Sequence, residues 1–209
     1  MTISILGCGW YGKALGLSLI NSGNTVNGSS TSPAKMEALA EAGIIPCLVD
    51  IRPESEAYDD GFFNCDVLII SIPPKIRQGE GGDYLPKIKR IITAAKKHGV
   101  NKVIYISSTA VYGDNNTEGT ELNPPEPDTE SGRILREAEG LFSGETSFET
   151  TILRFAGLVG PGRHPGRFFA GKKDIPNGRA PVNLIHLNDC IGITTAIINQ
   201  NAFGRVFNG

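Results

Sequence analysis

The chain has 209 residues, of which 40% are hydrophobic and 20% are charged, and its formal net charge is −2. This length suits one globular domain with a sizeable core, and the near-neutral charge gives no electrostatic basis for binding nucleic acid or a membrane. No apolar run approaches the roughly 20 residues of a membrane span, and the first six residues lack the basic region of a signal peptide. A cytoplasmic protein, monomeric or homodimeric, is expected.

Short apolar runs alternate with helical patterns along the chain. Strands are predicted at residues 3–6, 24–28, 46–50, 67–70, 103–106, 151–154 and from 206, and helices at 10–21, from 32, 84–98, 129–142 and 187–199. The apolar run at 67–70 is typical of a strand buried on both faces. The alternation predicts an α/β fold, a Rossmann-type doubly wound parallel sheet in three α/β/α layers, with residues 1–209 forming a single domain.

A glycine-rich loop, Gly7-Cys8-Gly9-Trp10-Tyr11-Gly12, follows the first predicted strand and opens the first helix. In this context the G-x-G-x-x-G pattern indicates dinucleotide binding. The first glycine permits the tight turn, the second lets the backbone approach a pyrophosphate, and the third lets the helix pack on the strand. The helix N-terminus adds free N–H groups and partial positive charge. We predict that these six residues form the binding loop of a nicotinamide dinucleotide.

The end of the second strand bears on the choice between NAD and NADP. An NAD site usually has an acidic residue there, which binds the ribose diol. This chain has Ser29, Ser30 and Thr31 instead, and Lys35 is the nearest cation. No acid would repel a 2′-phosphate, so NADP is favoured over NAD, although the serines are also typical of a cap on the next helix. Asp50, at the end of the third strand, is placed to contact the adenine amino group or is a turn residue.

The four cysteines, Cys8, Cys47, Cys65 and Cys190, include no C-x-x-C pair. This spacing gives no support to a zinc or thioredoxin-like site, and no metal site is predicted. Buried, inert thiols are expected.

Three later segments carry a family resemblance. They are Ser107-Ser108-Thr109-Ala110-Val111-Tyr112-Gly113, the run from Leu153 to Arg163, and the run from Val182 to Asp189. The S-S-x-x-V-Y-G and L-R-x-x-x-x-x-G-P-G-R patterns, in this order, resemble the extended short-chain dehydrogenase/reductases, the family of NAD-dependent epimerase/dehydratases that act on nucleotide sugars. The resemblance covers essentially the whole chain, and residues 156–172 resemble a bacterial, YeeZ-like branch.

The resemblance implies roles for the matching positions. Ser108 would be the catalytic hydroxyl that binds the substrate. Residues along the cofactor after the fourth strand would be Ser71, Ile72 and Pro73, and those lining the nicotinamide would include Phe155, Ala156, Gly157 and Leu158. His186 would flank a small-molecule substrate, although a structural role at the start of the last helix is equally consistent with its position.

The sequence departs from the family at the catalytic pair. The family has Tyr-x-x-x-Lys on a helix, where Lys lowers the Tyr pKa and Tyr transfers the proton. The equivalent positions here are Ser131 and Leu135, or, shifted by one, Gly132 and Arg136, so neither register supplies the pair. Tyr112, just beyond Ser108, is the candidate replacement.

The Gly/Pro-rich segment after the sixth predicted strand contains Arg163, His164 and Arg167. Two arginines there suit a phosphate or carboxylate on the substrate, and ordinary surface charge is the alternative. The chain stops where extended members continue into a small C-terminal substrate domain, so we expect that domain to be largely absent.

Two interpretations follow. In the first, the protein is an NAD(P)-dependent oxidoreductase or epimerase-like enzyme that acts on a sugar-like or nucleotide-linked substrate. In the second, it is a catalytically inactive NAD(P)-binding regulator or redox sensor, because the Tyr/Lys pair is missing.

Overall fold

The computed structural model describes residues 1–79, 81–114, 118–168, 170–175, 178–179 and 181–209, with residues 77, 167 and 168 described by their backbone alone. Within these residues one eight-stranded sheet has the order β10-β7-β6-β5-β1-β2-β3-β4. Its strands are β1 (Thr2–Leu6), β2 (Thr25–Ser30), β3 (Ile45–Ile51), β4 (Glu56–Tyr58), β5 (Val67–Ile70), β6 (Lys102–Ser108), β7 (Glu149–Phe155) and β10 (Val206–Asn208). Adjacent strands are parallel except for the pair β3 and β4.

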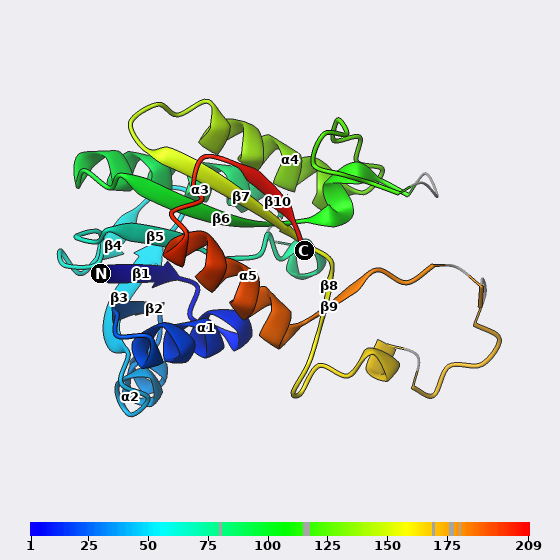
Figure 1. Ribbon diagram of the computed structural model, residues 1–209, viewed down its shortest axis with the longest axis horizontal. Helices are drawn as coiled ribbons and strands as arrows, with labels where there is room; N and C mark the ends of the chain where they lie inside the picture. Colours follow the sequence, from blue (N-terminus) through cyan, green and yellow to red (C-terminus); the bar gives the residue numbers. More distant parts are fainter. Residues whose placement is uncertain (80, 115–117, 169, 176–177, 180) are drawn as a thin grey trace.

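Helices cover both faces of the sheet, as Figure 1 shows. On one face lie α1 (Trp10–Asn21), α2 (Pro33–Ala40) and α5 (Leu187–Asn199), and on the other lie α3 (Gly81–Lys97) and α4 (Glu130–Ser143). Each layer of helices packs on its own apolar cluster. The predicted three-layer, doubly wound Rossmann fold is therefore confirmed.

Strand β5 illustrates why the sheet is covered on both sides. Val67 and Ile69 belong to the apolar cluster under α1 and α5, while Leu68 and Ile70 belong to the cluster under α3 and α4. Successive side chains of a strand point to opposite faces, so an uninterrupted apolar run requires a helix layer on each side. This is the burial that the sequence pattern predicts.

The strand order reverses between β1 and β5, which are neighbours in the sheet. From β1 the chain moves outward through β2 and β3, and after β4 it returns to β5 on the other side. In open α/β sheets, ligands bind at the carboxyl ends of the strands at such a switch point. The glycine loop leaves β1 at this place.

Some elements were not expected from the sequence. The short edge strand β4 pairs antiparallel with β3, and β8 (Gly157–Val159) pairs with β9 (Leu184–His186) in a separate parallel ribbon. Three short 3-10 helices are η1 (Ile76–Gln78), η2 (Thr109–Tyr112) and η3 (Pro165–Phe168). Three-residue strands have too few side chains to show a periodic pattern, so only the fold reveals them. Among the described helices, none is long and apolar enough to cross a membrane.

Candidate dinucleotide and substrate site

Gly7 is held from both neighbouring strands. Its N–H donates to the Ser29 hydroxyl of β2 at 2.8 Å, and its carbonyl accepts from the Ser71 hydroxyl after β5 at 2.9 Å. Gly7 has φ +100°, and a Cβ there would lie 2.9 Å from the Ser71 backbone, so only glycine fits. Two hydroxyls thus brace the turn from which α1 begins.

The next two glycines differ in their surroundings. A Cβ on Gly12 would collide with the Gly7 carbonyl, so this glycine permits the close packing of α1 on the loop. A Cβ on Gly9 would meet nothing within 4 Å. Gly9 is the N-cap of α1, and the first turn of that helix has no acidic residue. Open space beside the unpaired N–H groups of a helix start fits a dinucleotide pyrophosphate.

This loop borders a cleft of about 1180 Å³, larger than the roughly 300–1,000 Å³ of typical small-molecule pockets. Predicted residues that line the cleft are Gly7, Cys8, Gly9, Trp10, Ser29, Ser30, Thr31, Asp50, Ser71, Ile72 and Pro73. Lys13, Lys35 and Arg52 also line it, and Lys13 and Arg52 were not predicted from the sequence. The cleft therefore gathers residues from the ends of β1, β2, β3 and β5, as a dinucleotide site at the switch point requires.

At the end of β2, where the sequence predicts the adenosine of the cofactor, the serines have structural partners. Ser29 accepts the Gly7 N–H, while the Ser30 hydroxyl bonds the backbone N–H and carbonyl of Ser32 at 3.1 Å each. Ser32 is the N-cap of α2, but its side chain makes no capping bond. Thr31 is exposed. The Asp50 carboxylate is paired with Arg52 at 2.7 Å.

Cys8 is half-buried at the edge of the cleft, where its surroundings disfavour the reactive thiolate form. Burial raises the pKa of the Cys8 thiol to about 12, with Lys13 acting in the opposite direction. Cys47, Cys65 and Cys190 likewise have pKa values raised by burial. Among the described residues no cluster of three or more His, Cys, Asp or Glu side chains could hold a metal ion.

Several predicted cofactor residues face the core or line neither described pocket. The Tyr11 ring is buried, its hydroxyl lies 2.7 Å from the Thr194 hydroxyl, and it packs edge-on against Phe155. Ala156 is buried in the same apolar cluster. Gly157 and Leu158 belong to β8. These five residues line neither the cleft nor the smaller pocket described next.

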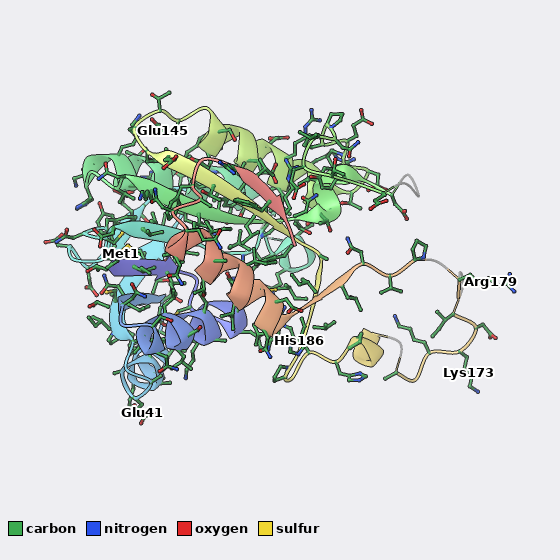
Figure 2. The ribbon with its side chains drawn as sticks, in the orientation of Figure 1. Met1, Glu41, Glu145, Lys173, Arg179 and His186 are labelled. Carbon is green, nitrogen blue, oxygen red and sulfur yellow. The ribbon has the colours of Figure 1, made fainter. Side chains whose placement is uncertain are left out.

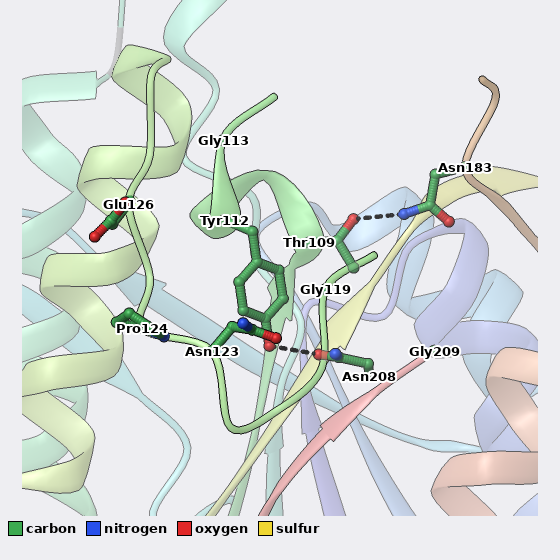
Figure 3. A pocket seen from close by; sticks show the side chains of 10 residues that line it. All are labelled: Thr109, Tyr112, Gly113, Gly119, Asn123, Pro124, Glu126, Asn183, Asn208 and Gly209. Carbon is green, nitrogen blue, oxygen red and sulfur yellow. Dashed lines mark hydrogen bonds between the residues drawn. The ribbon is translucent and has the colours of Figure 1, made fainter. Parts of the chain in front are cut away.

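A second pocket, of about 480 Å³, opens beside η2 and the end of β10 (Figure 3). Its lining is formed by Thr109, Tyr112, Gly113, Gly119, Asn123, Pro124, Glu126, Asn183, Asn208 and Gly209. Amide and hydroxyl groups dominate, the Thr109 hydroxyl accepts from the Asn183 amide at 3.3 Å, and no Lys or Arg is among these residues. Such amide and hydroxyl groups around an aromatic ring, with the carboxyl group of Glu126 beside them, suit a hydroxylated ligand.

Tyr112 is the best-anchored polar side chain in this pocket. Its hydroxyl donates to the Asn208 side-chain oxygen at 2.9 Å and accepts from Arg154 at 2.6 Å. Arg154 in turn forms a buried ion pair of 2.6 Å with Glu139 of α4. Burial alone would lower the pKa of Arg154, but its bonds with Glu139 and Tyr112 raise it. Ser108 lies at the start of η2, where its hydroxyl accepts the Ala110 N–H at 3.2 Å.

Helix α4 has no room for the catalytic pair of the family. A Cβ on Gly132 would collide with the Ala110 carbonyl of η2, and Leu135 is buried in the apolar cluster. Arg136 is exposed. In the shifted register, the space for a tyrosine side chain at Gly132 is therefore filled by the backbone of η2, and in the first register the lysine position, Leu135, lies in the apolar core. Sequence reasoning missed Arg154 and Asn208 as partners of Tyr112, because they lie 42 and 96 positions away from it.

The described parts of the segment 160–183 extend away from the sheet on one side, and Figure 2 shows Lys173 and Arg179 at the outer part of this segment. Arg163 is exposed near its start. The His164 ring accepts the Gly166 N–H at 3.1 Å, and the His186 ring accepts the Asn188 N–H at 3.2 Å, which caps α5. Arg167 lies in η3, and its side chain is outside the described part of the chain.

Comparison with known proteins agrees with this geometry. A family model described as NAD(P)H-binding matches residues 7–183. The chain belongs to this NAD(P)H-binding family. Protein YeeZ of Escherichia coli (strain K12) is 40% identical over 210 residues, which cover 99% of this chain and 76% of YeeZ.

Solved structures share the fold. A functionally unknown conserved protein from Silicibacter pomeroyi DSS is 28% identical, with a TM-score of 0.74 over 99% of this chain and 71% of that one. The UDP-glucuronic acid 4-epimerase from Bacillus cereus, in complex with UDP-glucuronic acid and NAD, is 22% identical. Its TM-score is 0.77, over 100% of this chain and 77% of that one. The NAD(P)H-binding protein described here therefore has the fold of the epimerase/dehydratases.

Proposed function

We propose that this protein is an oxidoreductase or epimerase-like enzyme of the short-chain dehydrogenase/reductase superfamily that acts on a sugar-like or nucleotide-linked substrate. The observation that carries the proposal is the polar, amide-rich pocket around Tyr112, in which Glu126 is the one acidic side chain. This pocket lies at the carboxyl ends of β6 and β10, and the dinucleotide cleft lies at the carboxyl ends of β1 and β5 in the same parallel sheet. Substrate and cofactor would then be bound from one edge of the sheet.

Tyr112 and Ser108 are the proposed catalytic residues. A phenol hydroxyl is suited to exchange a proton with a substrate hydroxyl or carbonyl. Arg154 and Asn208 hold the Tyr112 oxygen from two sides, which fixes its position without a residue from α4. The bound nicotinamide would supply the hydride acceptor or donor. His164, Arg167 and His186, on the segment and ribbon beside α5, are proposed to contact the substrate.

NADP is proposed in preference to NAD. Thr31 and Lys35 line the cleft at the end of β2, and the residues from 29 to 35 include no carboxylate that would repel a 2′-phosphate. Lys13 lines the same region, with its ammonium donating to the Ala38 carbonyl of α2 at 3.0 Å. Lysine binds phosphate as a point charge, so this end of the cleft supports the larger cofactor.

Titration with NADPH and NADH, followed by cofactor fluorescence, tests the binding half of the proposal. Saturable binding that is tighter for NADPH is expected, and no saturable signal with either cofactor at high micromolar concentration would contradict it. The catalytic half is tested with NADP and a panel of nucleotide sugars, by cofactor absorbance and by epimer analysis of the sugar. Turnover of at least one sugar, lost in Ser108→Ala, is expected.

A catalytically inactive regulator is the second candidate, and the packing of α4 is what favours it. In each of the two possible registers, one position of the Tyr/Lys pair is blocked. A side chain at Gly132 would collide with η2, and Leu135 lies in the apolar core. Tight cofactor binding with no turnover, and unchanged biological function in Ser108→Ala, would favour this candidate over the enzyme.

A further inference from the structure

Trp10 and Arg163 lie far apart in the sequence and meet beside the glycine loop. Trp10 is the first residue of α1 and lines the dinucleotide cleft. Its indole N–H donates to the Pro161 carbonyl at 2.7 Å. The guanidinium carbon of Arg163 lies 4.4 Å from the centre of the Trp10 ring. The start of the segment 160–183 is therefore attached to the N-terminus of α1.

The turn that carries Arg163 is well defined. Gly160 and Arg163 exchange two backbone hydrogen bonds, of 2.9 and 3.3 Å, and Gly162 has φ +72°. A Cβ on Gly160 would lie 3.2 Å from the Trp10 ring, so a side chain there would push against the indole. The compact turn thus presents Arg163 directly on the ring.

The charge of Arg163 is not neutralised by a carboxylate. Among the described residues, no ion pair includes it, and it is exposed. Stacking on an indole uses the face of the guanidinium and leaves its N–H edge available. No acidic residue lies in the first turn of α1. Arg163 lines neither described pocket, but the ring on which it stacks belongs to Trp10, which lines the cleft at the start of α1. The guanidinium would therefore reach the region of partial positive charge at the helix start from the rim of the cleft.

We propose that Arg163 binds the pyrophosphate of the bound dinucleotide from the outer side of the glycine loop, with Trp10 as its platform. A guanidinium matches phosphate oxygens with two parallel hydrogen bonds, and the pyrophosphate of a dinucleotide lies at this helix N-terminus. This assignment differs from the substrate role predicted from the sequence. It rests on the dinucleotide site and not on the proposed turnover. Cofactor binding would then also fix the turn from which the substrate-side segment begins.

The test compares NADPH binding, without substrate, by the full chain and by Arg163→Ala, Arg163→Lys and Arg179→Ala. Arg179 is the matched control, since it lies at the outer part of the same segment (Figure 2). Cofactor fluorescence gives Kd, and Trp10, the one tryptophan of the sequence, gives an independent signal from the loop itself. Arg163→Ala should raise Kd by about tenfold or more, Arg163→Lys should raise it less, and Arg179→Ala should leave it unchanged.

Competition with two NADPH fragments locates the contact. Adenosine 2′-monophosphate, which lacks the pyrophosphate, should compete equally well in the wild type and in Arg163→Ala, while 2′-phospho-ADP-ribose should lose affinity in the variant. An unchanged Kd for NADPH in Arg163→Ala, or an equal loss for both fragments, would overturn the assignment. Absence of turnover with every sugar would contradict the proposed function and leave these binding results intact.

Discussion

Arg154 donates a hydrogen bond of 2.6 Å to the phenol oxygen of Tyr112, while its opposite edge pairs with Glu139. The guanidinium also lies 4.8 Å from the centre of the Tyr112 ring. The buried ion pair between Arg154 of β7 and Glu139 of α4 therefore fixes the position of the Tyr112 hydroxyl on η2. In the family that the sequence resembles, the catalytic tyrosine lies on a helix, and Tyr112 is its proposed replacement.

The first prediction concerns Tyr112→Phe. This variant should keep the fold and the affinity for NADPH, because the ring still packs beside Arg154 and lies outside the dinucleotide cleft. Turnover should fall by about 100-fold or more, the usual contribution of a positioned acid or base. The control is Tyr58→Phe, on the antiparallel edge strand β4. Equal turnover of Tyr112→Phe and wild type would show that the Tyr112 hydroxyl does not take part in the reaction.

The second prediction concerns α4. Leu135→Lys would restore a lysine where the family has one, but it would place an ammonium group among buried apolar side chains. The free energy of unfolding should fall by at least about 3 kcal/mol. Arg136→Lys, one position along and exposed, should change it by less than about 0.5 kcal/mol. Chemical denaturation of both variants measures the difference, and a stable Leu135→Lys protein would show that α4 can admit the lysine of the catalytic pair.

Most of the fold and the centre of the cofactor site could be predicted from the sequence, because both rest on local patterns. The apolar run at 67–70 indicates a strand buried on both faces, and the spacing of Gly7, Gly9 and Gly12 indicates the loop. The partners of these residues could not be predicted. Ser29 lines the cleft as a cofactor residue would, but its bond to the Gly7 N–H, across 22 positions, has no local signal in the sequence.

Contacts between residues far apart in the sequence determine where the other side chains of the site point. Tyr11 stands in the glycine pattern, but its ring faces the core because Phe155 and Thr194 come to the same side of α1. Arg154 lies inside an apolar strand, where a sequence pattern does not show that a buried Glu139 will pair with it. Side-chain direction at such positions depends on tertiary packing, which single-sequence patterns do not contain.

The third prediction concerns the choice of cofactor. Lys35→Glu would place a carboxylate in the cleft at the end of β2. The affinity for NADPH should fall because of repulsion of its 2′-phosphate, while the affinity for NADH should change little. The ratio of the two dissociation constants, measured by titration, checks this. Lys89→Glu, exposed on α3, is the control for overall charge. A parallel loss of affinity for both cofactors would place Lys35 away from the 2′-phosphate.

The fourth prediction concerns the thiols. Burial raises the pKa of Cys8 to about 12 and that of Cys190 to about 11, from a usual value of 9.0. Because the thiolate is the reactive form, iodoacetamide should modify the native protein slowly at pH 8 and the unfolded protein rapidly. Mass spectrometry counts the adducts. Rapid modification of Cys8 in the native state would contradict the packing of the loop.

The raised pKa of Cys8 also predicts how the free energy of unfolding depends on pH. Below the usual thiol pKa of 9.0, Cys8 keeps its proton in both the folded and the unfolded protein, so its contribution to the free energy of unfolding is fully present. Between 9.0 and about 12 only the unfolded chain releases it, so the free energy of unfolding should fall as pH rises through that range. Cys8→Ser, whose hydroxyl does not titrate there, should reduce this slope.

The fifth prediction concerns the brace of the glycine loop. In Ser29→Ala the Gly7 N–H loses its 2.8 Å acceptor, while the Ser71 hydroxyl still holds the Gly7 carbonyl. An unsatisfied N–H should lower the free energy of unfolding by about 1–3 kcal/mol. Ser143→Ala, at the exposed end of α4, should lower it by less than about 0.5 kcal/mol. Because the loop would lose one of its two supports, NADPH and NADH should both bind more weakly to Ser29→Ala. A loss confined to NADPH would instead show that the Ser29 hydroxyl binds the 2′-phosphate.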